Sequence, residues 1–188
     1  MKNLLAAAAL GLAFAAPAQA NTYAIDPTHT FVTYEIGHFG TSTNRGRFER
    51  KEGSVQFDRA GKTGKVEVSF EMNSISTGVA PLDKHLQSAD FFDAATYPTA
   101  RFVGDKFGFE GDKVTQVGGS LTLRGKTQPV VLKATRFNCY LNPLLRREVC
   151  GGDFETTIRR SQWGMTWGLD TGVPDEVRLL IQVEAIKL

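Results

Sequence analysis

Lys65-Val66-Glu67-Val68-Ser69-Phe70-Glu71-Met72 is the stretch that decides the fold class of this chain. Every even position is apolar and every odd position is polar, and this period of two is typical of a β-strand with one buried face. The last segment repeats the pattern, because the apolar residues from Val177 to Ala185 share one face. Shorter alternating runs lie between the two: Val32, Tyr34 and Ile36; Val55 and Phe57; Phe107 and Phe109; Leu121 and Leu123; Val130, Leu132 and Ala134; Phe154, Thr156 and Ile158. The sequence therefore predicts an all-β, antiparallel protein.

Turn residues separate these runs at short intervals. Asp58-Arg59-Ala60-Gly61-Lys62-Thr63-Gly64, Glu110-Gly111-Asp112 and Arg124-Gly125-Lys126 each favour a tight link between neighbouring strands. A strand set of this size closes into a barrel or stacks as a sandwich in order to hide its edges. The alternation alone does not choose between these two folds.

One connection, from Gly78 to Tyr97, breaks the strand pattern. The run Pro81-Leu82-Asp83-Lys84-His85-Leu86-Gln87 predicts a short helix with proline in its first turn, and Ser88-Ala89-Asp90 marks its end. We therefore expect one short helix near residues 81–90.

The N-terminal residues have the pattern of a secretory signal peptide. Lys2 precedes an apolar run of eleven residues, Leu4 to Phe14, and Ala18-Gln19-Ala20 has the small-x-small form of a cleavage site. The run is about half the length that a membrane-spanning helix needs. We expect residues 1–20 to be cleaved and residues 21–188 to form a single domain without a membrane anchor.

Charge and cysteine content narrow the functional classes. The net charge is only +2 over 188 residues, and acids are interspersed with the basic residues, which argues against a nucleic-acid partner. In an exported chain the two cysteines, Cys139 and Cys150, are expected to form a disulfide. The Cys-x-x-Cys spacing of a redox-active pair is absent.

No motif for catalysis is present. The sequence contains neither Gly-x-Ser-x-Gly nor His-Glu-x-x-His. His29, His38 and His85 are the only histidines, and their spacing fits no metal site on a single helix. A catalytic triad assembled in space stays open at this point, because triads are recognised by geometry. We expect neither an enzyme, nor a bound metal, nor a cofactor.

Aromatic residues are the most prominent feature of the composition, with 13 Phe, 4 Tyr and 2 Trp. They fit a filled core, since phenylalanine needs no polar partner, and they also fit a cavity for a long apolar ligand. Phe91 and Phe92 lie together in the irregular connection, where at least one is expected to cap an apolar opening. Lys84, His85 and Arg101 are candidate contacts for a ligand head group at such an opening.

Several blocks together resemble the YceI family of exported lipid-binding proteins. The most specific block runs from Asp83-Lys84-His85-Leu86-Gln87 through Ser88-Ala89-Asp90-Phe91-Phe92-Asp93 and is followed by Tyr97-Pro98. Further matches span nearly the whole chain in order: Tyr23-Ala24-Ile25-Asp26-Pro27 with His29; Phe31 and Val32 before His38-Phe39-Gly40; Gly53-Ser54-Val55-Gln56-Phe57-Asp58; Ala100-Arg101-Phe102; Gly119-Ser120-Leu121-Thr122-Leu123-Arg124-Gly125; Lys126-Thr127 with Pro129-Val130.

The resemblance implies a lipocalin-like antiparallel barrel of about eight strands. It implies that the long pore holds an isoprenoid quinone or a prenyl pyrophosphate, that the protein is a homodimer, and that it catalyses no reaction. The segment around the two cysteines resembles a subset, mostly from Gram-negative bacteria, for which a periplasmic location and a ubiquinone-type ligand are expected.

We predict eight residues that line the pore, the first six from blocks at the expected mouth and the last two from strand-like segments. They are Phe31, Phe39, Phe48, Leu86, Phe91, Phe92, Phe102 and Trp163. A stress-related β domain with a filled core and a lipid-modifying enzyme are the alternatives to a lipid carrier.

Overall fold

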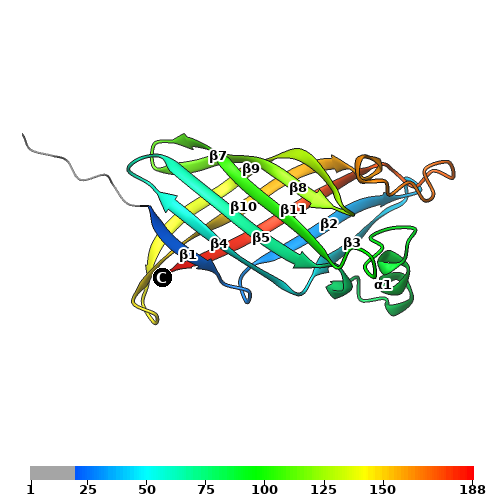
Figure 1. Ribbon diagram of the computed structural model, residues 1–188, viewed down its shortest axis with the longest axis horizontal. Coiled ribbons are helices and arrows are strands. Elements are labelled where there is room, and N and C mark those ends of the chain that lie inside the picture. The colour runs from blue at the N-terminus through cyan, green and yellow to red at the C-terminus, as the bar shows by residue number, and fades with distance from the viewer. Residues whose placement is uncertain (1–19) are drawn as a thin grey trace, which may run out of the picture.

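Eight antiparallel strands form a closed ring in the computed structural model, which describes residues 20–188 (Figure 1). Pairing of the first strand with the last closes the ring. In spatial order the strands are β1 (Asn21–Ile25), β4 (Lys51–Asp58), β5 (Thr63–Glu71), β7 (Thr99–Glu110), β8 (Lys113–Leu123), β9 (Lys126–Asn142), β10 (Arg147–Arg159) and β11 (Glu176–Lys187). The predicted antiparallel barrel is confirmed, while the expected signal peptide lies outside the described residues apart from Ala20.

Three further strands extend the wall at one end of the barrel. They are β2 (Phe31–His38), β3 (Ser42–Phe48) and β6 (Ile75–Ser76), and they pair in the order β11-β2-β3-β6. Strand β11 pairs with β2 over Arg178–Gln182 and with β1 over Ala185–Lys187. At the change of partner, the Thr30 hydroxyl accepts a hydrogen bond from the Glu184 N–H (3.3 Å) and donates one to its carbonyl (3.2 Å). Side-chain bonds thus continue the ladder across the break.

The alternation that predicted the strands also sets which side chains face inward. Val66, Val68 and Phe70 on β5 face the barrel interior, together with Met72 in the 3₁₀ helix that follows, η1 (Met72–Ser74). On β11 all five apolar residues that share a face in the sequence point inward: Val177, Leu179, Ile181, Val183 and Ala185. Because both faces of a strand are fixed by the same register, the polar residues between them face outward.

Helical segments lie at the end of the barrel that carries β2, β3 and β6 (Figure 1). Helix α1 (Ala80–Gln87) begins with Pro81 in its first turn, and it confirms the predicted helix near residues 81–90. The second 3₁₀ helix, η2 (Arg160–Trp163), leads into an irregular segment of residues 164–175, which we call the strap. No helix among residues 20–188 is both long and apolar enough to cross a bilayer.

A disulfide joins Cys139 and Cys150, as predicted. The two residues are directly opposite each other on β9 and β10, with Cα atoms 4.1 Å apart. The bond therefore cross-links a hairpin that the backbone already pairs.

Candidate functional site: an apolar cavity inside the barrel

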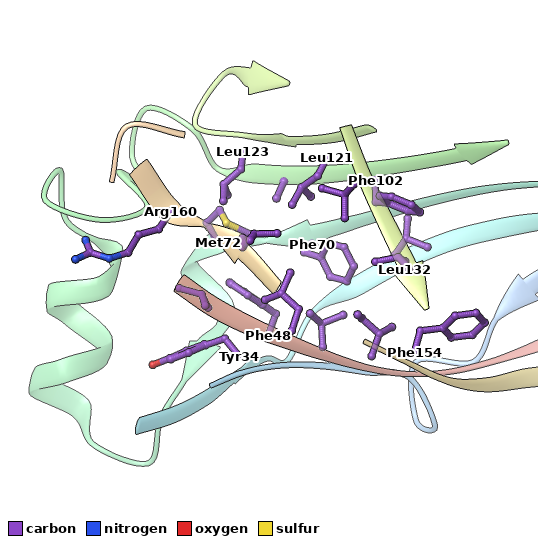
Figure 2. A pocket seen from close by; sticks show the side chains of 18 of the residues that line it. Tyr34, Phe48, Phe70, Met72, Phe102, Leu121, Leu123, Leu132, Phe154 and Arg160 are labelled. Carbon is purple, nitrogen blue, oxygen red and sulfur yellow. The ribbon is translucent and has the colours of Figure 1, made fainter. Parts of the chain in front are cut away.

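The barrel encloses a cavity of about 440 Å³, so its core is not filled (Figure 2). This size falls within the usual range of small-ligand sites. Aliphatic and aromatic side chains from every strand of the ring contribute to the wall. The central part is lined by Val55, Val66, Val68, Phe70, Phe102, Val117, Leu121, Leu132, Phe154, Leu179, Ile181 and Val183.

Packed aromatic rings close the cavity at the end near β1. Phe57, which is 3 % exposed, stacks on Phe109 with ring centroids 6.0 Å apart and contacts Phe137 edge-on at 5.7 Å. Phe107 and Tyr23 lie on the other sides of the same ring, at 6.3 and 6.5 Å. We call these five residues the aromatic plug. The Tyr23 hydroxyl faces away from the cavity and donates to Glu148, so burial and this carboxylate raise its pKa.

The opposite end, which we call the mouth, lies between α1 and the strap. His85 on α1 contacts the Trp167 ring of the strap edge-on at 4.8 Å and the Phe91 ring at 5.0 Å. The Asp90 carboxylate lies 3.1 Å from His85 Nε2 on the outer side. Arg124 joins the segment that follows α1 to the strap, donating to the Ala89 carbonyl (3.2 Å) and to the Gly164 carbonyl (2.9 Å). The mouth is therefore covered by the strap and by α1 with the residues that follow it, which contact each other through the His85, Phe91 and Trp167 rings and through Arg124.

Arg160 holds the strap in its shape from within. Its side chain is 2 % exposed, and its guanidinium donates to four carbonyl oxygens: Pro174 (2.8 Å), Met165 (2.9 Å), Trp167 (2.8 Å) and Val173 (3.1 Å). Burial lowers its pKa, while the nearby Asp175 opposes this shift. The Phe91 ring centroid lies 5.9 Å from the guanidinium carbon. A single cation thus fixes both ends of the strap and lies at the mouth of an otherwise apolar cavity.

Helix α1 is tied to the barrel by its own first turn. The Asp83 carboxylate accepts hydrogen bonds from the Thr77 N–H (2.7 Å) and hydroxyl (2.6 Å). Tyr34 lies behind this turn on the cavity wall, and burial together with the Asp83 charge raises its pKa to about 12. The tyrosine is therefore a neutral part of the wall at physiological pH.

Most of the predicted site residues do lie around this cavity. The wall or mouth includes Phe39, Phe48, Leu86, Phe91, Phe92 and Phe102, and His85 of the candidate head-group contacts. Phe39 is 58 % exposed at the rim, whereas Phe48, Leu86 and Phe102 are buried. The structure brings these residues together, and their binding of a ligand stays a prediction.

Four predicted residues do not line the cavity. Phe31 faces outward, with Arg47 and Lys51 over its ring, because Val32 next to it faces inward. Arg101 is likewise outside, paired with Glu67, since Ala100 and Phe102 occupy the inner register. Trp163 lies in η2, where its buried indole donates to the Leu121 carbonyl (3.2 Å), and Lys84 is exposed on the outer side of α1.

Two residues that the sequence reasoning missed complete the mouth, namely Arg160 and Trp167. The alternation that ends at Ile158 extends to Arg160, but the sequence does not show its hydrogen-bond acceptors, which are backbone carbonyls of the strap. Trp167 follows η2 in a segment without strand alternation, so its side-chain direction could not be assigned from periodicity.

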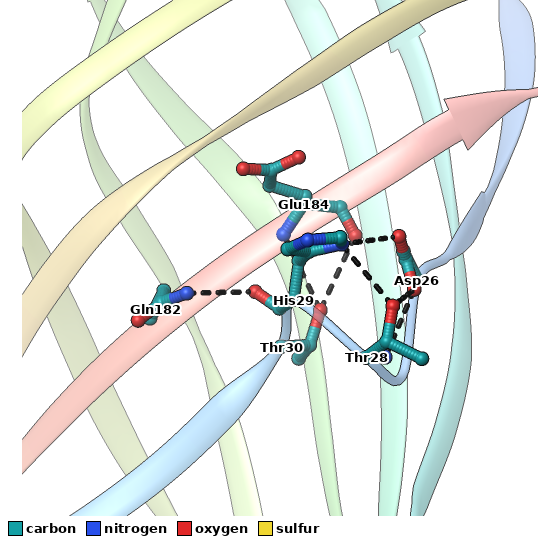
Figure 3. Close-up of polar contacts among 6 residues, drawn as sticks. All are labelled: Asp26, Thr28, His29, Thr30, Gln182 and Glu184. Atoms are coloured by element: carbon teal, nitrogen blue, oxygen red, sulfur yellow. Dashed lines mark hydrogen bonds and ion pairs between the residues drawn. The ribbon is translucent and has the colours of Figure 1, made fainter. Parts of the chain in front are cut away.

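A compact Asp-Thr-His group lies outside the barrel, in the loop between β1 and β2 (Figure 3). His29 Nδ1 lies 2.7 Å from Asp26 Oδ2 and 3.1 Å from the Thr28 hydroxyl. A catalytic relay needs the two ring nitrogens to bond different partners. Here the same nitrogen, His29 Nδ1, contacts both the Asp26 carboxylate and the Thr28 hydroxyl, and the Thr28 hydroxyl donates to Asp26 (2.6 Å). The group is therefore a clamp on the loop rather than a triad.

The clamp also explains the electrostatics of the loop. Burial opposes ionisation of Asp26, but hydrogen bonds from Thr28 and His29 outweigh it and lower the pKa to about 2. The same bond to Asp26 raises the pKa of His29. Gln182 on β11 donates to the His29 carbonyl (3.1 Å), so the loop is fixed to the barrel wall. Residues 20–188 contain no group of three or more His, Cys, Asp or Glu that could hold a metal ion.

Comparison with known proteins places these features in a family. Residues 23–185 match the YceI-like domain. A UPF0312 protein of Pseudomonas savastanoi pv. phaseolicola is 42% identical over 140 residues, which cover 72% of this chain and 73% of that protein. A UPF0312 protein of Pseudomonas aeruginosa is 36% identical over an alignment that covers 100% of this chain and 99% of that protein.

Solved structures share the fold. Burkholderia cenocepacia BcnA has a TM-score of 0.71 at 25% identity, covering 85% of this chain and 98% of its own. The Campylobacter jejuni YCEI protein has a TM-score of 0.70 at 27% identity, covering 81% and 90%. A polyisoprenoid binding domain from Saccharophagus degradans has a TM-score of 0.63 at 14% identity, covering 88% and 98%, and shares the barrel alone.

Proposed function

The chain belongs to the YceI-like domain family, and from this premise we propose that it binds an isoprenoid lipid inside the barrel. The tail occupies the apolar cavity, and the head group lies at the mouth. The observation that carries the proposal is the distribution of polarity along the cavity. Apolar side chains line most of the cavity. Among the polar residues of the lining, His38, Asn44, His85, Arg160 and Thr171 belong to β2, β3, α1, η2 and the strap, whereas the Thr30 hydroxyl is already bonded to the Glu184 backbone.

The tail supplies the binding free energy in this proposal. Each buried methylene contributes about 0.8 kcal/mol, so a few isoprene units suffice without an ionic anchor. The polyisoprenoid binding domain of Saccharophagus degradans, which has the same fold, is consistent with such a ligand.

The head group is proposed to be that of an isoprenoid quinone such as ubiquinone, with a prenyl pyrophosphate as the alternative. Arginine and histidine N–H groups are suitable donors to a quinone carbonyl and to a phosphate oxygen. Four of the five guanidinium N–H groups of Arg160 are already used by carbonyls, which favours a single weak additional acceptor over a multiply charged phosphate.

The proposal includes carriage or storage of the lipid in the periplasm by a homodimer. The signal-peptide pattern of residues 1–20 supports export. A lipid tail exposed to water is unfavourable in an aqueous compartment, so a closed barrel would keep it soluble there. Sedimentation velocity of the purified protein tests the oligomeric state, and we expect a single species with the mass of a dimer.

Native mass spectrometry of protein purified from its host tests the ligand. We expect one bound species per barrel, with the mass of an isoprenoid quinone. Leu132 and Val131 provide a matched pair of variants, since Leu132 lines the cavity and Val131 is 54 % exposed on the outer wall. We expect Leu132→Trp to lose the bound lipid and Val131→Trp to keep it.

Three outcomes would reject parts of this proposal. Ligand-free protein that takes up no quinone would favour a structural domain that carries no lipid in its cavity. Retention of the lipid by Leu132→Trp would move the site elsewhere. Lipid recovered chemically altered after incubation would indicate an enzyme.

A further inference from the structure

The tip of the β9–β10 hairpin carries the largest group of exposed apolar side chains in the described part of the chain. Nine large apolar residues are exposed among residues 20–188, and four of them fall within residues 140–145. They are Tyr140 (43 % exposed), Leu141 (70 %), Leu144 (90 %) and Leu145 (48 %). Isolated exposed leucines need no explanation, but a group of this kind on one projecting turn is typical of a contact surface.

The tip, residues 140–147, is an ordered turn. The Asn142 side-chain oxygen accepts hydrogen bonds from the N–H groups of Leu144 (3.0 Å) and Leu145 (3.1 Å). The Arg146 N–H donates to the Asn142 carbonyl (2.8 Å), and Arg146 adopts a φ of 53°. The Cys139–Cys150 disulfide cross-links the strands three residue pairs below the turn. The leucines are therefore presented in a fixed arrangement.

The tip is also cationic. Neither Arg146 nor Arg147 has a carboxylate within 4.0 Å in residues 20–188. The nearest acid in sequence, Glu148, is bonded to Arg59 (2.8 Å) and to the Tyr23 hydroxyl. Two free cations beside three exposed leucines match a surface with negative charge outside and hydrocarbon beneath.

We propose that this tip docks onto the surface of an anionic lipid bilayer. Leu144 and Leu145 enter the boundary between head groups and acyl chains, while Arg146 and Arg147 contact lipid phosphates. A stable protein interface buries about 800 Å² on each partner, which one turn does not supply, whereas bilayer insertion has no such minimum. Docking of the tip on the same tip of a second copy would place four arginines together, and that repulsion disfavours a symmetric dimer here.

The position of the tip gives this contact a definite orientation. The β9–β10 turn lies at the end of the barrel near β1 and the C-terminus, while α1 and the mouth lie at the opposite end (Figure 1). A protein docked by its tip would hold its mouth away from that membrane. The inference does not depend on the identity of any ligand in the cavity.

Flotation of the full-length mature protein with lipid vesicles tests the proposal. The probes are phosphatidylethanolamine vesicles with and without phosphatidylglycerol. We expect binding only to the anionic vesicles, weakened by added salt. The double variant Leu144→Ser/Leu145→Ser should lower the partition coefficient about tenfold or more, and Arg146→Gln/Arg147→Gln should lower it about thirtyfold. Val131→Ser, an equally simple change on the barrel wall, should bind as the wild type does.

The opposite results are equally distinct. Wild-type protein that stays with the buffer at low salt overturns the proposal, and so does equal flotation of the leucine variant. Loss of a dimer in the leucine variant, without any vesicle binding by the wild type, would assign the tip to a second copy. Native mass spectrometry of the same variants measures the cavity ligand separately, and we expect it to be unchanged.

Discussion

Replacing Arg160 by leucine tests whether one buried cation holds the cover of the mouth. The change removes four hydrogen bonds of 2.8–3.1 Å to the carbonyls of residues 165, 167, 173 and 174. At about 1 kcal/mol net for each bond, the loss is about 4 kcal/mol, and relief of the buried charge offsets part of it. We expect the free energy of unfolding to fall by about 3 kcal/mol, which lowers Tm by about 10 °C in a domain of this size.

The sharper readout is local, because the four carbonyls all belong to the strap. Hydrogen exchange measured by mass spectrometry should show faster exchange in residues 164–175, and bound lipid should dissociate faster. Arg159→Leu is the matched control, since the Arg159 side chain is adjacent in sequence but 66 % exposed, and its guanidinium lies 3.8 Å from the Glu176 carboxylate. Equal unfolding free energies for the two variants, or unchanged exchange in the strap of Arg160→Leu, would refute this account of Arg160.

Three further perturbations follow from the structure. Replacing both Cys139 and Cys150 by serine should lower the free energy of unfolding by about 3 kcal/mol in urea, and a loss below 1 kcal/mol would show that backbone pairing alone suffices. Asp26 has a pKa of about 2 in the folded state, below its ordinary value of 3.8, so the stability that it contributes is present above about pH 4 and is lost as the pH falls towards 2. In Asp26→Asn the unfolding midpoint should depend less on pH over that interval. Parallel pH profiles for the wild type and the variant would contradict the role of the clamp. Trp167→Ala removes the contact between strap and α1 and should speed lipid release with little change in Tm, whereas Trp163→Ala should lower Tm because its indole is 1 % exposed.

The fold was predictable from the sequence wherever a strand has one apolar face. The alternation from Val66 to Met72 assigned the inner wall correctly, as did that from Val177 to Ala185. The same rule, applied consistently, places Phe31 outside, because Val32 and Tyr34 already occupy the inner face of β2. The same parity places Arg101 outside, because Ala100 and Phe102 occupy the inner face of β7, so residue type and family block alone do not identify the cavity wall.

Other parts of the site had no local signal. Strand β3 (Ser42–Phe48) is mostly polar, and it is defined by pairing with β2 and β6 rather than by periodicity. Arg159 and Arg160 are alike in type, yet Arg159 is 66 % exposed, whereas Arg160 follows Ile158 in the inward register and bonds four carbonyl oxygens of the distant strap residues. Such differences depend on long-range backbone contacts, which a single sequence does not reveal.

The aromatic plug gives the barrel a fixed floor. Under the proposed function, a lipid tail that enters through the mouth would advance end first as far as Phe57 and Phe107. The distance from the plug to the mouth would then set the length of tail that fits. A shorter tail would leave the inner part of the cavity empty, and a longer tail would place its head group outside Trp167. The barrel would therefore select lipids by tail length, and the size of the side chains in the aromatic plug would set the depth that is available to the tail.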